Sequence, residues 1–195
     1  MNSVAKASLR KEIKSKLNSL TKEEKTQQSK IVTSALLSHP VYKKSQRLSI
    51  FLSMPDEIQT DSVLKHALEN GKKVFIPRYD SSSTYMDMVR LHSWEQYDAL
   101  PTTRWNIKQP PLDKECEQAL NTGGLDLVLI PGLAFTRAGD RMGRGKGYYD
   151  TFLEKCKEVS LQPPTTIALA FKESILPEIP IDEKDVPIDI VLAAD

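Results

Sequence analysis

The feature that most constrains the fold is an apolar strand, a helix and a second apolar strand that follow one another between residues 47 and 77. Residues 47–54 (RLSIFLSM) and 73–77 (KVFIP) are short apolar runs, and the segment from Thr60 to Gly71 has the apolar spacing and the end signals of a helix. Strands joined by a helix over so short a length pair in parallel. The pattern therefore predicts an α/β fold in which ligands bind at the carboxyl ends of the strands.

The alternation of strand and helix continues beyond this unit. Residues 86–91, 125–130 and 166–171 are further apolar runs with strand character, and the spacing predicts a helix from Tyr148 to Val159 between the last two. The tail beyond Pro177 alternates prolines, acids and short apolar pairs, and no element is predicted in it. We predict a single α/β domain over residues 1–195, with three α/β/α layers around a mainly parallel sheet, similar to the Rossmann fold but without its dinucleotide fingerprint.

Two helices are predicted before the first strand. Apolar residues recur at three- and four-residue steps over residues 4–20, which places them on one face of a helix. Thr21 followed by Glu24 matches a capping box, in which the hydroxyl and the carboxylate satisfy the first free amides of a helix. The second helix is expected to start there and to end near His39.

Charge and composition exclude several classes of protein. Lysine and arginine total 27 and aspartate and glutamate 26, so a net charge of +1 gives no overall attraction to nucleic acid or anionic membrane. No apolar run reaches the roughly twenty residues of a membrane span. Cys116 and Cys156 are too few for a disulfide framework, which favours a reducing compartment. We predict a cytoplasmic protein, and the basic segment 6–16 leaves a mitochondrial presequence as the alternative.

One segment concentrates glycine and positive charge. Residues 131–150 (PGLAFTRAGDRMGRGKGYYD) hold five of the eight glycines and four cations, Arg137, Arg141, Arg144 and Lys146. Glycines let backbone amides approach an anion, the cations neutralise phosphate charge, and the next helix adds its positive N-terminal end. The segment predicts a polyphosphate site, and the alternative is a basic, mobile surface loop. Neither the Walker nor the Rossmann template fits its glycine spacing.

Acidic residues near this segment are candidate magnesium ligands. A nucleotide phosphate site usually needs Mg²⁺, which is held by one or two carboxylates and by water. Asp150 follows the loop directly, and the tail offers Asp182, Glu183, Asp185 and Asp189 if it folds back across the loop. The alternative is that Asp150 stabilises a helix dipole and that the tail acids are solvated.

The sequence shows no local pattern of a protein nucleophile. His39, His66 and His92 lack the spacing of paired ligands, and there is no Gly-x-Ser-x-Gly elbow. A transfer in which substrate atoms attack, while the protein aligns them and offsets phosphate charge, fits these residues. Glu57, just beyond a strand end, is placed to pair with ring N–H donors, with a solvated turn as the alternative, and Trp105 fits either the core or a pocket wall.

The segment LVLIPGLAFTRAGDRMGRGKGYYDTFL (127–153) resembles the signature of the 5-formyltetrahydrofolate cyclo-ligase family. The likeness extends in order through KASLRKEIK, SIFLSMPDEIQT, KVFIPRY, MDMVRL, WNIKQP, NTGGLDL and ALAFKE. It implies an ATP- and Mg²⁺-dependent conversion of 5-formyltetrahydrofolate to 5,10-methenyltetrahydrofolate, with release of ADP and phosphate. In the implied mechanism the formyl oxygen attacks the γ-phosphate, and N10 then attacks the phosphorylated formyl group.

The resemblance also implies the residues of the site. The implied nucleotide contacts are Lys6, Arg10, Arg141, Met142, Gly143, Arg144, Gly145, Lys146, Gly147, Tyr148 and Tyr149. The implied folate contacts are Leu52, Glu57 and Tyr148, and the implied metal ligands are Asp150 and Asp185, with Asp189 as the alternative to Asp185. Catalytic roles fall to Arg144 and Lys146, which would offset γ-phosphate charge, and to Tyr148, which would position the pterin or formyl group. Met142 stands where leucine is common in the family, and Thr136 where aspartate is frequent.

Two other functions stay open on the sequence. One is a nucleotide-sugar or sugar-phosphate enzyme on a similar scaffold, because fold alone does not fix chemistry. The other is a non-enzymatic protein whose basic loop binds RNA or a phosphoprotein, against which the near-neutral charge and the lack of aromatic–basic repeats argue. We predict small-molecule substrates, no nucleic-acid or membrane partner, and a monomer.

Overall fold

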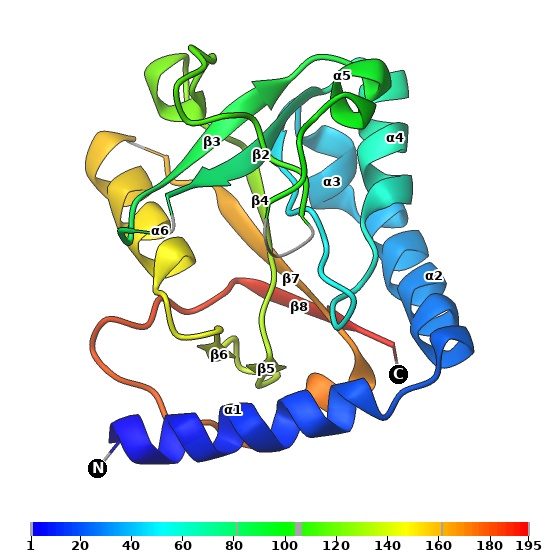
Figure 1. Ribbon diagram of the computed structural model, residues 1–195, viewed down its shortest axis with the longest axis vertical. Coiled ribbons are helices and arrows are strands. Elements are labelled where there is room, and N and C mark those ends of the chain that lie inside the picture. The colour runs from blue at the N-terminus through cyan, green and yellow to red at the C-terminus, as the bar shows by residue number, and fades with distance from the viewer. Residues whose placement is uncertain (1, 81, 104–106, 161, 195) are drawn as a thin grey trace.

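A six-stranded sheet forms the centre of the structure, a computed structural model that describes residues 2–80, 82–103, 107–160 and 162–194 (Figure 1). Trp105 lies outside the described residues. The strand order is β3-β2-β1-β4-β7-β8, and all neighbouring pairs are parallel except β2 with β3. The strands are β1 (Arg47–Ser49), β2 (Lys73–Tyr79), β3 (Met86–Leu91), β4 (Leu127–Ile130), β7 (Thr165–Ala170) and β8 (Ile190–Ala193).

Helices cover both faces of this sheet, with α2 and α4 on one side and α6 on the other (Figure 1). The helices are α1 (Asn2–Asn18), α2 (Lys22–Ser38), α3 (Pro40–Lys44), α4 (Asp61–Glu69), α5 (Trp94–Asp98) and α6 (Tyr148–Val159), with short 3-10 turns η1 (Ala119–Asn121) and η2 (Lys172–Ser174). Within the described ranges, no helix combines the length and the apolar character that a bilayer span requires.

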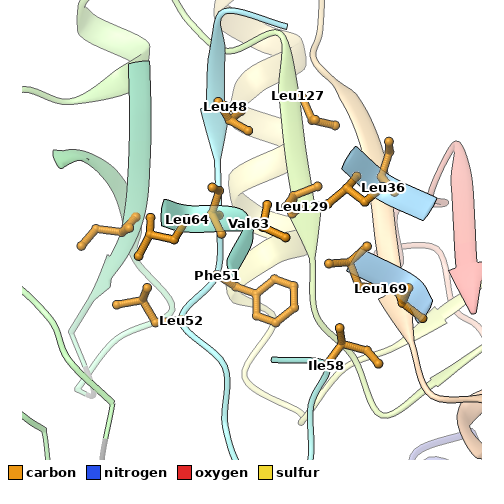
Figure 2. Close-up of a cluster of buried hydrophobic side chains, with 14 of the residues drawn as sticks. Leu36, Leu48, Phe51, Leu52, Ile58, Val63, Leu64, Leu127, Leu129 and Leu169 are labelled. Atoms are coloured by element: carbon orange, nitrogen blue, oxygen red, sulfur yellow. The ribbon is translucent and has the colours of Figure 1, made fainter. Parts of the chain in front are cut away.

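Alternate residues of each strand enter different hydrophobic clusters, because successive side chains of a strand point to opposite faces. Leu127 and Leu129 of β4 lie in a cluster with residues of α2 and α4 (Figure 2) that also includes residues of α1. Val128 and Ile130 belong to the cluster that contains Phe152 of α6. Two apolar cores therefore sandwich the sheet. The predicted α/β class, with helices on both faces of a mainly parallel sheet, is confirmed.

The start of α2 has the predicted capping box. The Glu24 amide donates to Thr21 Oγ1 over 3.1 Å, and the Thr21 amide donates to Glu24 Oε2 over 2.8 Å. These bonds satisfy two amides that have no partner inside the helix. The helix ends at Ser38, next to the predicted end at His39.

Several elements differ from the sequence prediction, three of them strands of the central sheet. β1 ends at Ser49 rather than near residue 54, because the following backbone turns to the start of α4, where Phe51 O accepts a 2.6 Å hydrogen bond from Thr60 Oγ1. β2 continues to Tyr79, where it pairs with Met86 of β3. The tail contains β8, parallel to β7, although prolines and acids precede this strand in the sequence.

The order of strands places a binding edge between β1 and β4. These strands are neighbours, and the chain leaves β1 toward β2 on one side and β4 toward β7 on the other. Ligands of open α/β sheets bind at such a switch point, outside the carboxyl ends of the strands. The turn after β1 contains Asp56 and Glu57, and the segment after β4 is the glycine-rich loop.

Candidate active site

A cavity of about 1170 Å³ lies at this edge of the sheet. Five segments of the described chain line it: α1, the turn after β1, the turn between β2 and β3, the glycine-rich loop with α6, and the C-terminal tail. Among the residues that the sequence singled out, those lining the cavity are Lys6, Arg10, Glu57, Arg141, Gly143, Arg144, Gly145, Lys146, Gly147, Tyr148, Tyr149, Asp150, Asp182, Glu183 and Asp185. The fold therefore brings together side chains from both ends of the chain.

Two predicted contact residues lie elsewhere. Leu52 and Met142 are 7% and 2% exposed and belong to the hydrophobic cluster on the α1–α2–α4 side of the sheet. Figure 2 shows Leu52 among the packed side chains near Phe51. Neither residue is part of the cavity lining in the described chain. Both residues are next to site residues in the sequence, but their side chains pack in the hydrophobic core of this structure.

The glycine-rich loop begins with a small hairpin that the sequence did not predict. Its strands are β5 (Ala134–Phe135) and β6 (Arg141–Met142), paired antiparallel. The turn between them includes Gly139, whose φ of +100° suits glycine, and a Cβ there would lie 2.2 Å from Ile188 O in the tail. Glycine at this position therefore allows the hairpin to pack directly against the tail.

The loop ends at an uncapped helix N-terminus. Gly147, with φ of +71°, is the N-cap of α6, and no side-chain capping hydrogen bond is found there among the described residues. The first N–H groups of a helix have no intrahelical partner, and the helix dipole is positive there. Because Gly147, Tyr148 and Tyr149 all line the cavity, this end of α6 is suited to bind an anion.

The tail folds back across the loop, as the sequence required for a shared acidic site. Asp150 Oδ1 accepts from the Val186 amide over 3.2 Å, and its Oδ2 lies 2.7 Å from Arg141 Nη2. Lys6 Nζ binds both Asp182 Oδ2, over 2.8 Å, and Asp185 Oδ2. The two carboxylates proposed as metal ligands therefore each form an ion pair with a basic side chain of the protein, Asp150 with Arg141 and Asp185 with Lys6.

Asp189 does not share this position. Its Oδ2 accepts from the amide of Thr166 over 2.8 Å and from the Thr166 hydroxyl over 2.7 Å, next to the pairing of β7 and β8. The residue is absent from the described cavity lining. Of the two alternatives, Asp185 is the one that faces the cavity.

Helix α1 is joined to the loop as well as to the tail. Arg10 Nε donates to Gly143 O over 2.9 Å, and Lys6, one turn earlier, binds the tail acids. The two acidic partners raise the pKa of Lys6 above its usual value against the opposing effect of its burial, so its ammonium charge is retained at neutral pH. Lys146 lines the cavity and is exposed.

Arg144 crosses from the loop to the turn after β1. Its Nε lies 3.1 Å from Glu57 Oε1, and its Nη2 lies 2.6 Å from Asp56 Oδ1. Burial raises the pKa of Glu57, although the guanidinium and a 2.9 Å hydrogen bond from the Met54 amide favour the carboxylate. Glu57 is therefore a buried carboxylate in the wall of the cavity rather than a solvated turn residue.

Two adjacent tyrosines differ in their hydrogen bonding. Tyr148 Oη donates to Asp80 O over 3.0 Å, and its ring centroid lies 5.2 Å from that of Tyr79. Tyr149 Oη is buried, and no described residue bonds to it. Burial, with Glu57 nearby, raises the pKa of Tyr149, so the hydroxyl keeps its proton. Arg141 Nε is a second buried donor that lacks a partner among the described residues.

The donor set at the acidic end of the cavity is compatible with a hard cation. In the described part of the chain no group of three or more His, Cys, Asp or Glu side chains is arranged to hold a metal ion. Asp150 and Asp185 supply two carboxylates, and Mg²⁺ commonly takes one or two carboxylates while phosphate oxygens and water complete its shell. The residues present therefore fit a metal that arrives with a nucleotide.

Sequence reasoning missed Asp56, although the signal was present. It precedes Glu57 in a turn at the end of a central strand, the position from which α/β folds present functional side chains. The cation that it binds, Arg144, belongs to a loop 88 residues away, so no local pattern revealed the contact.

Comparison with known proteins gives a consistent result. The model of the 5-formyltetrahydrofolate cyclo-ligase family matches residues 2–194. A 5-formyltetrahydrofolate cyclo-ligase of Mus musculus is 50% identical over 191 residues, which cover 98% of this chain and 94% of the mouse protein. A probable 5-formyltetrahydrofolate cyclo-ligase of Caenorhabditis elegans is 43% identical over 96% of this chain and 91% of its own length.

The folds agree as well. The solution structure of Aquifex aeolicus 5,10-methenyltetrahydrofolate synthetase superimposes with a TM-score of 0.78 at 26% identity, covering 97% of this chain and 89% of that one. A 5,10-methenyltetrahydrofolate synthetase from Mycoplasma pneumoniae has the same fold, with a TM-score of 0.71 at 20% identity over 96% and 97% of the two chains. The chain therefore belongs to the 5-formyltetrahydrofolate cyclo-ligase family of enzymes.

Proposed function

We propose that this enzyme converts 5-formyltetrahydrofolate to 5,10-methenyltetrahydrofolate with ATP and Mg²⁺, releasing ADP and phosphate. The observation that supports this most is a single cavity in which a cationic glycine-rich loop at a helix N-terminus lies close to a buried carboxylate, Glu57. The first feature suits a triphosphate, and the second suits the N–H donors of a pterin ring. Both substrates are anions, and the loop and α1 supply the charge that they need.

The nucleotide would lie between α1 and the loop. Arg10 reaches the loop backbone at Gly143, and a Cβ on Gly145 would lie 3.6 Å from the Arg10 guanidinium carbon, so backbone and cation meet at one place. The uncapped amides at the start of α6 complete a surface of N–H donors for phosphate oxygens. Lys146 adds a flexible cation to the same surface.

The proposed chemistry uses nucleophiles of the substrate. The formyl oxygen attacks the γ-phosphorus and the bond to ADP breaks. N10 then attacks the formyl carbon, loses its proton, and the carbon–oxygen bond to phosphate breaks as the ring closes. The residues of the chain orient the two substrates and offset charge: Arg144 and Lys146 toward the transferred phosphoryl group, Tyr148 toward the pterin or formyl group, and Glu57 toward the pterin edge.

Asp150 and Asp185 are the proposed metal ligands. Bound Mg²⁺ would offset negative charge on the triphosphate. In the structure Arg141 and Lys6 neutralise these two carboxylates. Both cations line the cavity, so they would bind phosphate oxygens once their carboxylates take another partner.

The test is an assay of the purified protein with Mg²⁺, ATP and 5-formyltetrahydrofolate. The methenyl product should appear as a new near-ultraviolet absorbance only when all three are present. Arg144→Ala should lower turnover by on the order of a hundredfold, the effect of removing a group that stabilises transition-state charge. Arg137→Ala is the matched control, because Arg137 belongs to the same loop but lies outside the cavity lining. Absence of an ATP-dependent product would refute the proposal.

Three broader properties belong to the same proposal. Residues 1–195 act as one domain, the enzyme is a monomer, and it works in the cytoplasm on small molecules without a nucleic-acid partner. A single peak of monomer mass in light scattering, unchanged with protein concentration, is the expected result for the second property.

A further inference from the structure

Asp56 forms an ion pair with Arg144, a residue of the cavity lining, and none of the proposed roles involves Asp56. Its side chain is 10% exposed, and its Oδ1 lies 2.6 Å from Arg144 Nη2. Glu57 Oε1 meets Nε of the same guanidinium at 3.1 Å. Two carboxylates therefore hold one cation, and each takes a different nitrogen.

The two contacted nitrogens define the orientation of Arg144. Nε and Nη2 lie along one edge of the planar guanidinium, whose donors have a fixed fork geometry. With both nitrogens of this edge engaged, the plane and the rotation of the group are set. Among the described residues Nη1 has no hydrogen-bond partner, and Arg144 lines the cavity. The carboxylates thus leave this nitrogen available to a ligand.

The charges of the cluster argue against a purely structural anchor. Asp56 and Glu57 are both buried and bring two negative charges to one positive charge. Glu57 alone would pair with Arg144, and a second buried carboxylate adds a desolvation cost. The second carboxylate has another effect: a guanidinium held by one bond can rotate, whereas one held along an edge cannot.

We infer that Asp56 is a positioning residue that, together with Glu57, fixes the Arg144 guanidinium so that Nη1 faces the transferred phosphoryl group. The inference rests on the proposed function of Arg144. Asp56 touches neither substrate in this assignment, and its whole effect on the reaction passes through Arg144.

The main experiment is a double-mutant cycle with Asp56→Asn, Arg144→Ala and the double variant. Asp56→Asn keeps the size of the side chain and should lower kcat by about tenfold, because an ion pair becomes a hydrogen bond to a neutral acceptor, while the KM for ATP stays within about twofold. In the Arg144→Ala background the same change should have no further effect on kcat. An equal loss in both backgrounds would overturn the inference.

Asp87→Asn is the matched control. Asp87 is buried to a similar degree and pairs with Arg78 over 3.7 Å, but neither residue lines the cavity. This variant should lose stability without loss of kcat. If Asp56→Asn affects thermal stability alone, as the control does, then Asp56 is structural and the inference is wrong.

A second measurement does not depend on turnover. Trypsin cleaves after arginine, and a guanidinium that is held by two carboxylates resists entry into the protease site. Cleavage between Arg144 and Gly145, followed by mass spectrometry, should be faster in Asp56→Asn than in the native protein, and cleavage after Arg137 should be unchanged. Equal rates after Arg144 would refute the anchoring. A native protein that lacks ATP-dependent turnover would instead refute the proposed function.

Discussion

Replacement of Tyr149 by phenylalanine should make the protein more stable and less active. The Tyr149 hydroxyl is buried and has no partner in the described structure, whereas its ring packs against both hydrophobic clusters. A buried hydroxyl that forms no hydrogen bond destabilises the folded state, and a phenyl ring fills the same space without that polar atom. The Tyr149 hydroxyl therefore lowers the stability of the folded enzyme when no substrate is bound.

The size of the effect follows from the cost of an unsatisfied polar group. Mutational data put that cost at about 1–3 kcal/mol. For a protein of this size, each kcal/mol shifts Tm by about 2–4 °C, so Tyr149→Phe should raise Tm by about 2–12 °C. The same change removes a buried donor near Glu57 from a residue that lines the cavity, so the affinity for one of the two substrates should fall.

Scanning calorimetry and urea unfolding measure the first effect, and steady-state kinetics measure the second. Tyr148→Phe is the matched control, because the Tyr148 hydroxyl donates to Asp80 O and its loss should leave Tm equal or lower. A Tyr149→Phe protein that is less stable than the native protein would show that the hydroxyl is satisfied, and the reasoning would be wrong.

Three further predictions concern other parts of the site. Lys6→Ala should raise the KM for ATP more than that for 5-formyltetrahydrofolate, since Lys6 lies at the acidic end of the cavity with Asp185; steady-state kinetics with the opposite pattern would refute that placement. Gly139→Ala should lower Tm by several degrees because the new Cβ would lie 2.2 Å from Ile188 O, and an unchanged melting curve would contradict this packing. Burial raises the pKa of Glu57, so its contribution to stability is present below its unfolded pKa of 4.5 and is lost as the pH rises through its folded pKa. In urea titrations, Glu57→Gln should remove this part of the pH dependence of the unfolding free energy. If the native protein and the variant lose the same unfolding free energy between pH 4 and 8, this role of Glu57 is excluded.

Local patterns in the sequence were enough to predict several elements of the structure. The capping box at Thr21 and the helix from Tyr148 to Val159 depend on neighbours within one or two turns, and both are present. The glycine-rich loop was recognisable because its glycines and cations are contiguous. The alternation of strands and helices predicted a ligand site at the carboxyl ends of the strands, whereas the switch point between β1 and β4 depends on a strand order that only the structure shows.

Contacts between segments that are distant in the sequence could not be predicted from local patterns. Leu52 follows a strand at the same edge as Glu57, yet its side chain belongs to the core, because the direction of each side chain depends on how the backbone turns after β1. Asp56 and Arg144 are 88 residues apart, and no local pattern in either segment indicates that they are in contact. β8 was missed because its four residues gain their strand partners only from β7.

The ion pair between Lys6 and Asp185 joins residues 179 positions apart in the sequence. During synthesis α1 leaves the ribosome first, and it must wait for almost the whole chain before its partners in the tail exist. Until then Ile13 and Leu17, both fully buried in the finished protein, have only part of their packing surface. Contacts of such long range slow folding and prolong the exposure of apolar surface. A nascent chain that terminates before the tail would carry an intact glycine-rich loop, yet it could not assemble the cavity.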